Sequence, residues 1–456
     1  MLVPRTRLIF WTSAILLPFA VLAGTVPSAA AIAFACIGLF IMVVLADAVL
    51  AGRLLAGIKI NLPDVVRLQN RRTGSISVHV LNASERGRLI RIGIAFPREV
   101  ESPEVDRLVQ IPDGEGESKL DWPCVPNRRG QYFLEQVCVE TASTFGFWAV
   151  RGSRATKCEL RVYPDLLAER NLAPSLFLRR TDLGIHAQRY AGQGREFEKL
   201  REFVPGDSLS DIHWKASAKR GKPVTKVFQI ERTHEVYVVI DASRLSARRL
   251  MIPNPDAKKG SGAEMIETSA LERYVTASLI LALAAEQQGD QFGIVTFSDK
   301  VIDFVRARNG QAHFDACRDR LYTLHPHDVS PDFEELFTFI RLRLRKRALL
   351  VFLTALDDPV LADSFTKASD LIARQQLLLV NMLQPPMAHP LFSENAPVAT
   401  TDDLYRRLGG HLQWNSLREL QKVLQRRGIR LSFLDPLKLS AELIAQHAEV
   451  RARQLV

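Results

Sequence analysis

Acidic, basic and aromatic side chains are crowded into one short stretch of this chain, between Gly194 and Arg220. Glu196, Asp207 and His213 are the groups in this stretch that could move protons or, with a divalent cation, activate a water molecule for hydrolysis. His213 has no adjacent serine or cysteine that spacing alone would place within reach, which argues against nucleophilic catalysis. A metal-dependent hydrolase that uses the corner formed by Glu196, Asp207 and His213 is therefore one hypothesis for the function.

The residue pattern of this stretch predicts two short helices separated by a turn. Three apolar residues fall at helical spacing on one face of the first helix: Phe197, Leu200 and Val204. The segment 205–207, Pro-Gly-Asp, then ends that helix, because proline fixes one dihedral angle and glycine permits the next. Asp207 or Ser210 can cap a second helix, in which Trp214 and Ala218 share a face.

The order of these residues resembles the signature of the domain of unknown function 58 family. That signature reads like Gly-x-x-Phe-x-x-Leu-Arg-Glu-Tyr-x-Pro-Gly-Asp followed by Ile-x-Trp-Lys-x-x-Ala-Arg. The matching positions here are Gly194, Phe197, Leu200, Arg201, Glu202, Pro205, Gly206, Asp207, Ile212, Trp214, Lys215 and Ala218. The resemblance implies a membrane-anchored protein with a von Willebrand factor A-like domain that is associated with a MoxR-type AAA+ ATPase. We interpret the motif as a buried ion-pair and capping cluster that braces two domains, with a docking surface as the alternative.

A second candidate site follows the first buried strand after the motif. Asp241 and Ser243 stand where A domains carry an Asp-x-Ser-x-Ser sequence, whose hard oxygen ligands, together with a distant Thr and Asp, suit Mg²⁺. The third position is Leu245, and Ala355 occupies the place of the second Asp, while Ser330 stands near the expected Thr. Since about six oxygen ligands are needed, we expect a degenerate remnant that binds no metal and no other cofactor.

Two uncharged apolar runs near the beginning of the chain, 8–24 and 29–46, are each about long enough to cross roughly 30 Å of hydrocarbon as a helix. Basic residues flank the pair while the turn between them carries no charge, so both ends are expected in the cytoplasm. Those flanking residues are Arg5, Arg7, Arg53 and Lys59. The alternative interpretation of the first run is a cleaved signal peptide. Even then, the second run would act as a stop-transfer segment in the membrane. We interpret Asp47 as a tolerated residue at the inner end of the second run.

The net charge is +10, with 60 Lys and Arg against 50 Asp and Glu. This surplus is diffuse, and its local clusters lack interleaved aromatic residues, so no nucleic-acid partner is expected. A basic surface suits the anionic inner leaflet of a bacterial membrane. The five cysteines are an odd number with no Cys-x-x-Cys pair, which favours a reducing compartment. Cys124, Cys138 and Cys158 are expected to pack as small hydrophobic residues.

The pattern of apolar residues, together with the motif and the two apolar runs, divides the chain into four parts. Alternating strand-length runs at 75–81, 89–94, 137–140 and 158–163 predict a small antiparallel β-sandwich. Apolar runs at 236–240, 292–297, 349–353 and 377–380 alternate with helical patterns at 267–288, 333–347, 362–374 and 416–427, which predicts a doubly wound parallel α/β sheet. We therefore expect a transmembrane helical hairpin with basic flanks at 1–59, a β-sandwich at 60–165, the family signature motif and a connector at 166–230, and a von Willebrand factor A-like α/β domain with C-terminal helices at 231–456.

Taken together, these features predict an inner-membrane, multi-pass protein with its soluble domains in the cytoplasm. We expect a scaffold or adaptor and not an enzyme. The expected partners are the membrane and, by family resemblance, a MoxR-type AAA+ ATPase. The metal-dependent hydrolase remains the alternative.

Overall fold

The computed structural model describes residues 1–52, 54–83, 87–112, 114, 117–167, 191–204, 212–229, 234–253, 265–391 and 400–453; of residues 191–199, 201 and 226–229 it describes the backbone alone. The chain divides into two compact units, Met1–Asp165 and Leu166–Val456. Each unit has its own hydrophobic core, as folded domains do.

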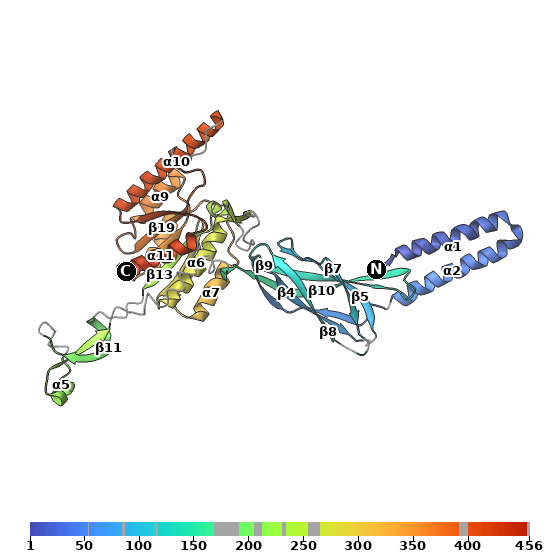
Figure 1. Ribbon diagram of the computed structural model, residues 1–456, viewed down its shortest axis with the longest axis horizontal. Coiled ribbons are helices and arrows are strands. Elements are labelled where there is room, and N and C mark those ends of the chain that lie inside the picture. Colours follow the sequence, from blue (N-terminus) through green and yellow to red (C-terminus); the bar gives the residue numbers. More distant parts are fainter. Residues whose placement is uncertain are drawn as a thin grey trace. The chain divides into compact units, whose positions relative to one another are not determined.

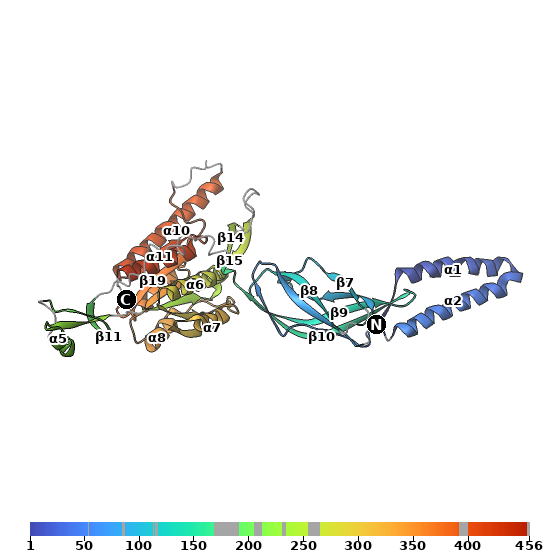
Figure 2. The same cartoon turned by 60° about the horizontal axis from the view of Figure 1, so that its bottom comes forward.

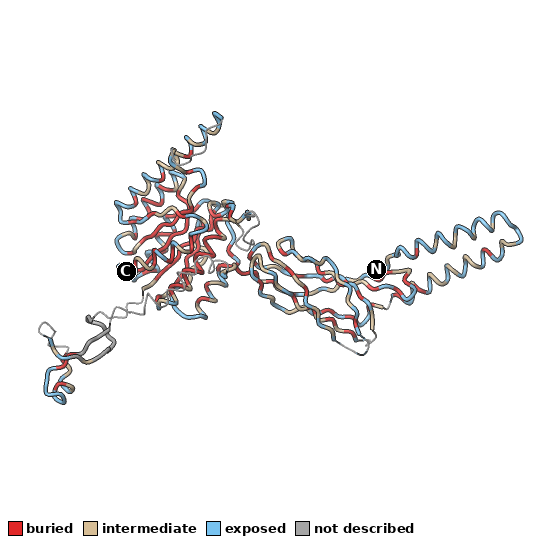
Figure 3. The backbone as a smooth tube through the Cα atoms, viewed as in Figure 1, coloured by how far each residue is buried: buried red, intermediate tan, exposed pale blue. Residues whose placement is uncertain are grey.

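Two long apolar helices form the first part of unit Met1–Asp165. They are α1, Thr6–Thr25, and α2, Ala30–Ala51, joined by the short 3₁₀ helix η1, Pro27–Ala29. Figures 1 and 2 show α1 and α2 side by side, and Figure 3 shows that most of their residues are exposed. Both helices are long and apolar enough to cross a membrane. The two predicted spans are therefore present as helices, each extending slightly beyond its uncharged run.

Two sheets share one core in the rest of this unit. One sheet has the order β1-β10-β9-β5-β7 with β3 beside β10, and the other has the order β2-β4-β8-β6. The strands are β1 Leu2–Pro4, β2 Ile58–Asn61, β3 Val65–Gln69, β4 Gly74–Asn82, β5 Arg88–Ile94, β6 Val100–Glu101, β7 Asp106–Ile111, β8 Glu117–Pro126, β9 Gly130–Ala142 and β10 Trp148–Tyr163. Buried residues alternate with half-buried or exposed ones along β4 and β5, so each sheet turns one face inward. Cys124 and Cys158 lie in this core as expected, whereas Cys138 is exposed, which corrects its predicted packing.

The carboxyl-terminal part of α2 is hydrogen-bonded to the loop between β9 and β10 and to the start of β10. The Asp47 side chain is fully buried, and its carboxylate accepts hydrogen bonds from Ser143 Oγ at 2.6 Å and from the Phe145 N–H at 3.2 Å. The Trp148 indole N–H donates to the Val44 carbonyl at 3.1 Å. The hydrogen bonds that Asp47 accepts compensate for its burial. They explain how a carboxyl group is accommodated near the end of an apolar helix.

The second unit contains a six-stranded sheet with the order β17-β16-β13-β18-β19-β20. Its strands are β13 Glu235–Asp241, β16 Gln291–Phe297, β17 Val301–Arg308, β18 Leu349–Leu353, β19 Leu377–Leu383 and β20 Arg430–Leu434. The five strands from β16 to β20 in this order are parallel, and β17 runs antiparallel at one end. The central strand β13 is buried on both faces, as its continuous apolar sequence predicts.

Helices pack against both faces of this sheet (Figure 1). The helices are α6 Ala270–Gln287, α7 Gln311–Leu321, α8 Phe333–Arg343, α9 Pro359–Ser369, α10 Thr401–Arg426 and α11 Leu439–Ala452. Apolar residues of α6, α7 and α11 pack with Val236, Val238 and Ile240 of β13. Those of α8, α9 and α10 pack with Tyr237 and Val239, whose side chains point the other way.

The signature motif forms a small hairpin with a helix, and this corrects the sequence prediction. Residues 197–202 belong to strand β11, Ala191–Glu202, and not to a helix. β11 pairs antiparallel with β12, Val224–Gln229, which supplies backbone hydrogen-bond partners that local spacing cannot reveal. The second predicted helix is present as α5, Trp214–Arg220. The proposed caps Asp207 and Ser210, like Pro205 and Gly206, lie outside the described residues.

Candidate functional site

The carboxyl ends of β13 and β18 bring together two polar residues that lie 113 positions apart in the sequence. Asp241 ends β13 and is fully buried, and Thr354 directly follows β18 and is also fully buried. The Thr354 hydroxyl donates a 2.6 Å hydrogen bond to Asp241 Oδ2, while the Ser243 N–H donates to Oδ1 at 2.8 Å. This edge is where open parallel sheets place their ligand sites.

The loop after β13 is itself held by local hydrogen bonds. Ser243 Oγ accepts from the Leu245 N–H at 3.4 Å and so caps the 3₁₀ helix η3, Arg244–Ala247. Ser246, one position late for the metal motif, donates its hydroxyl to the Ser243 carbonyl at 2.8 Å. Both hydroxyl groups of this segment therefore stabilise the turn.

The segment that holds the third expected ligand position lies beside this loop. The Arg244 N–H donates to the Val329 carbonyl, and the His327 N–H donates to the Ala242 carbonyl. Ser330 itself is exposed at the surface. The three segments that sequence comparison with A domains pointed to are thus adjacent, although Ser330 is not buried with Asp241.

A shell of larger polar groups surrounds the carboxylate. Tyr274 of α6 is buried, and its hydroxyl donates to the Thr354 carbonyl at 3.3 Å. Arg248, which follows η3, forms an ion pair with Asp357. Sequence reasoning missed Tyr274 and Arg248. The Arg248–Asp357 pair joins residues 109 positions apart, for which the sequence carries no local signal.

Burial governs the electrostatics of this site. Desolvation raises the pKa of Asp241 above its ordinary value, and the hydrogen bonds from Ser243 and Thr354 oppose that rise. Burial also raises the pKa of Tyr274, and the nearby Asp241 carboxylate adds to this increase. Burial thus disfavours the charged form of Asp241, which is the form that a cation site requires.

The residues present do not fit a divalent cation. Each oxygen of Asp241 already accepts a hydrogen bond, and Ala355, which has no oxygen in its side chain, stands beside Thr354. A Mg²⁺ ion demands near-octahedral coordination by oxygen ligands, usually including charged carboxylates. Within the part of the chain that the structure describes, no group of three or more His, Cys, Asp or Glu side chains could hold a metal ion.

The hydrolase corner is only partly described. His213 caps helix α5, because its Nδ1 accepts a 3.1 Å hydrogen bond from the Ala216 N–H. The side chain of Glu196 and the whole of Asp207 lie outside the described residues. The ring nitrogen that would accept a proton thus already has a structural role.

The motif residues that the structure does describe differ in exposure. Ile212 is buried, and the hydroxyl of buried Ser217 accepts from the Val224 N–H at 2.8 Å, which fastens α5 to β12. Trp214 is 70% exposed, and Glu202 and Lys215 are also at the surface. The expected burial of Trp214 in a brace is therefore wrong: Trp214 starts α5 and faces solvent, whereas Ile212 and Ser217 hold the hairpin. The side chains of Phe197 and Arg201 are not described, and Leu200 is half-buried.

Comparison with known proteins supports the resemblance seen in the sequence. A family model described as "Protein of unknown function DUF58" matches residues 199–389, a region that overlaps the motif beginning at Gly194. A search of the curated proteins found no match.

Several solved structures are similar to parts of the chain. An aerotolerance-related membrane protein from Bacteroides fragilis is 13% identical, with a TM-score of 0.29, and the match covers 48% of this chain and 99% of that one. The conserved hypothetical protein BatB from Bacteroides thetaiotaomicron is 12% identical, with a TM-score of 0.25 and coverage of 47% and 99%. The VWA domain of SpRpn10 is 10% identical, with a TM-score of 0.26 and coverage of 47% and 95%. Neighbours at this level of similarity say nothing about the function of this chain.

Proposed function

We propose that this protein is a membrane-anchored cytoplasmic scaffold or adaptor that works with a MoxR-type AAA+ ATPase in the assembly or maturation of other proteins. In this proposal α1 and α2 form a two-span anchor in the inner membrane, the two-sheet unit is a β-sandwich, and the α/β unit is a von Willebrand factor A-like domain with a degenerate metal site. The ATPase partner comes from the family resemblance.

The observation that carries the proposal is the state of Asp241. Its carboxylate is buried and hydrogen-bonded on both oxygens, and an alanine stands at the place of the second acidic ligand. A carboxyl group that is buried and hydrogen-bonded in this way stabilises the loops around it. With Asp241 in this structural role, the α/β domain is suited to contacting partner proteins through its surface.

The exposed residues of the signature motif support its interpretation as a docking surface. Trp214 is 70% exposed and lies next to Lys215, while Lys219 and Arg220 end the same helix. Exposed tryptophan beside cationic side chains is typical of residues that dominate binding energy at protein interfaces. We therefore assign the motif hairpin, formed by β11, α5 and β12, as the surface that contacts the ATPase.

A pull-down with the purified full-length chain in detergent tests this function. The MoxR-type ATPase encoded in the same genome is the probe, and the variants are Trp214→Ala and the control Tyr405→Ala, whose 71% exposed side chain lies on α10. We expect the parent and Tyr405→Ala to retain the ATPase and Trp214→Ala to lose most of it. Failure of the parent chain to retain the ATPase would overturn the proposal.

The hydrolase alternative predicts a different result. It requires a bound metal ion and a free proton acceptor, whereas His213 Nδ1 is engaged in capping α5. A stoichiometric divalent ion in elemental analysis of the purified chain, together with hydrolytic activity that is lost in His213→Ala, would favour it over the adaptor.

A further inference from the structure

One edge of strand β20 faces away from the rest of the sheet. β20 is the last strand in the sheet order of the described residues. The Gln384 N–H donates to the Leu434 carbonyl at 3.0 Å, so the backbone groups of Leu434 face β19. Because alternate residues of a strand direct their N–H and C=O groups to opposite edges, Leu431 and Phe433 direct theirs to the free edge.

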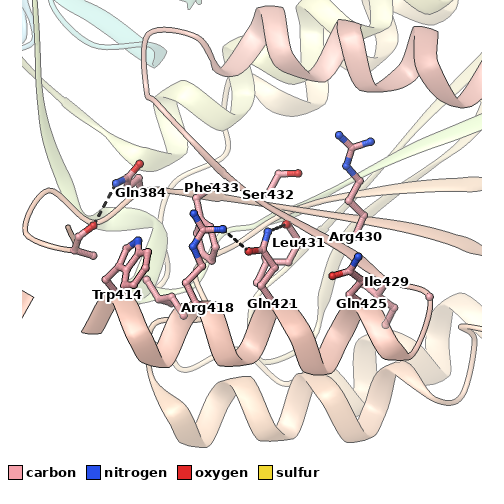
Figure 4. Close-up of a pocket in the computed structure, with 13 residues that line it drawn as sticks. Gln384, Trp414, Arg418, Gln421, Gln425, Ile429, Arg430, Leu431, Ser432 and Phe433 are labelled. Atoms are coloured by element: carbon pink, nitrogen blue, oxygen red, sulfur yellow. Dashed lines mark hydrogen bonds between the residues drawn. The ribbon is translucent and has the colours of Figure 1, made fainter. Parts of the chain in front are cut away.

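A groove of about 650 Å³ lies between β20 and α10. In Figure 4, Trp414, Arg418, Gln421 and Gln425 follow one another along α10 beside the residues of β20. The groove therefore has a strand edge on one side and a row of helix side chains on the other. That geometry resembles the grooves in which extended peptides add to a sheet.

A side chain occupies the hydrogen-bonding position that an added strand would use. Gln421 Nε2 donates to the Leu431 carbonyl at 2.8 Å, and Gln421 Oε1 accepts from Arg418 at 2.8 Å (Figure 4). The Leu431 carbonyl is thus satisfied by a surface amide from α10. The backbone N–H of an incoming strand can replace that amide without leaving the carbonyl unpaired.

The charge of the groove indicates the chemistry of its occupant. Its lining includes Arg418 and Arg430 and, among the described residues, no carboxylate. Arg430 is paired with Glu449 at 2.5 Å, whereas the guanidinium of Arg418 contacts the Gln421 amide and lies 5.3 Å from the centre of the Trp414 ring. The positive charge of Arg418 is therefore available to an acidic side chain. The partly buried Trp414 ring, which also stacks on His411, contributes apolar surface to the groove lining beside Arg418.

We propose that this groove binds an extended, acidic peptide segment of a partner protein, which adds as a strand to the free edge of β20. Arg418 pairs with a carboxylate of the peptide, and an apolar side chain of the peptide rests on Trp414. The groove is formed by α10 and β20 and not by the motif hairpin, so this binding does not require the ATPase of the proposed function.

Synthetic peptides test the proposal on the purified full-length chain. The probe is fluorescently labelled Glu-Val-Glu-Val-Glu-Val with blocked ends, and Lys-Val-Lys-Val-Lys-Val is its counterpart. Two further acidic probes carry backbone N-methyl groups, either on the three valines or on the three glutamates. Because alternate N–H groups point to opposite edges, one of these two probes loses every N–H that could pair with β20.

We expect the acidic peptide to bind at least tenfold more tightly than the basic one, and one N-methylated probe to lose binding while the other keeps it. Arg418→Glu should weaken binding about tenfold, while Arg426→Glu, on the same helix but outside the groove lining, should bind like the parent. The proposal is wrong if the acidic peptide does not bind, if both N-methylated probes bind equally, or if the two arginine variants behave alike.

Discussion

The hydroxyl of Thr354 donates a 2.6 Å hydrogen bond to the fully buried carboxylate of Asp241. This single contact joins the end of β13 to the residue that follows β18. The buried polar pair therefore acts as part of the domain core.

Replacing Asp241 by asparagine should change the dependence of stability on pH. Burial raises the pKa of Asp241 in the folded state above its unfolded value of about 3.9. The folded state then binds more protons, so this group contributes stability at low pH that is lost as the pH rises toward the folded pKa. Asp241→Asn keeps a neutral group at every pH. Its melting temperature relative to the parent should therefore rise between pH 4 and pH 7.

Thermal melts at one-unit intervals of pH measure this difference. Asp328→Asn, an exposed change on the neighbouring loop, serves as the control and should follow the parent throughout. A melting-temperature difference for Asp241→Asn that falls from pH 4 to pH 7 would show that the charged carboxylate is the favoured form.

Magnesium should leave the stability of the chain nearly unchanged. A ligand raises the melting temperature only by binding the native state, and the carboxylate of Asp241 is already hydrogen-bonded on both oxygens. Titration of Mg²⁺ into the purified chain, with a chelator-treated sample as the reference, measures the effect. A saturable rise in melting temperature would contradict the absence of a cation site.

Removing the Ser143 hydroxyl should destabilise the connection between α2 and the two-sheet unit. That hydroxyl donates to Asp47 at 2.6 Å and accepts from the Trp148 N–H at 3.0 Å. Leaving buried polar groups without a partner costs about 1–3 kcal/mol. Ser143→Ala should therefore melt several degrees below the exposed control Ser153→Ala in detergent. Equal melting of the two variants would mean that the Asp47 contact does not contribute to stability.

Trp214→Ala should melt like the parent. The side chain is 70% exposed, and substitutions at such positions usually change stability by less than about 0.5 kcal/mol. Ser217→Ala, which removes the buried hydroxyl that accepts from the Val224 N–H, is the contrasting variant and should lower the stability of the hairpin. A large loss of stability in Trp214→Ala would restore the interpretation of the motif as a brace.

A reporter fused after Val456 should be active only in the cytoplasm. Arg5 precedes α1 and Arg7 lies in its first turn, whereas the turn between α1 and α2 carries no charge, so the hairpin should insert with both ends inside. Reporters placed at Val456 and in that turn should give opposite results in a bacterial host. Activity of a periplasmic reporter at Val456 would contradict the proposed compartment and with it the ATPase partner.

The spacing of apolar residues predicted those helices and strands that are specified by their own residues. The buried strand β13 and the helix α6 are present near their predicted positions because each buries a continuous or amphipathic set of residues along its own length. The prediction failed at residues 197–202, where pairing with β12 overrides apolar spacing that also fits a helix. It also missed β20, whose pairing depends on β19, and it gave no bounds for α11, one of the expected C-terminal helices.

The candidate site likewise contains some residues that the local sequence identifies and some contacts that it does not reveal. Asp241 and Ser243 could be identified because a strand ends in a recognisable order of oxygen-bearing residues. The Thr354 contact, the buried Tyr274 and the Arg248–Asp357 pair join positions that are distant in sequence. Their partners are set by the sheet topology and by helix packing, neither of which is encoded in the residues next to them.

The pairing of β1 with β10 has a consequence for synthesis. Met1 donates its amino group to the Arg151 carbonyl, 150 residues further along the chain, and Leu2 pairs with Val150. At a ribosomal rate of about 5–20 residues per second, the first strand must wait roughly 8–30 seconds before its partner exists. During that interval α1 and α2, which are long and apolar enough to cross a membrane, are already synthesised. Both helices are therefore complete before the sheet that contains β1 can close.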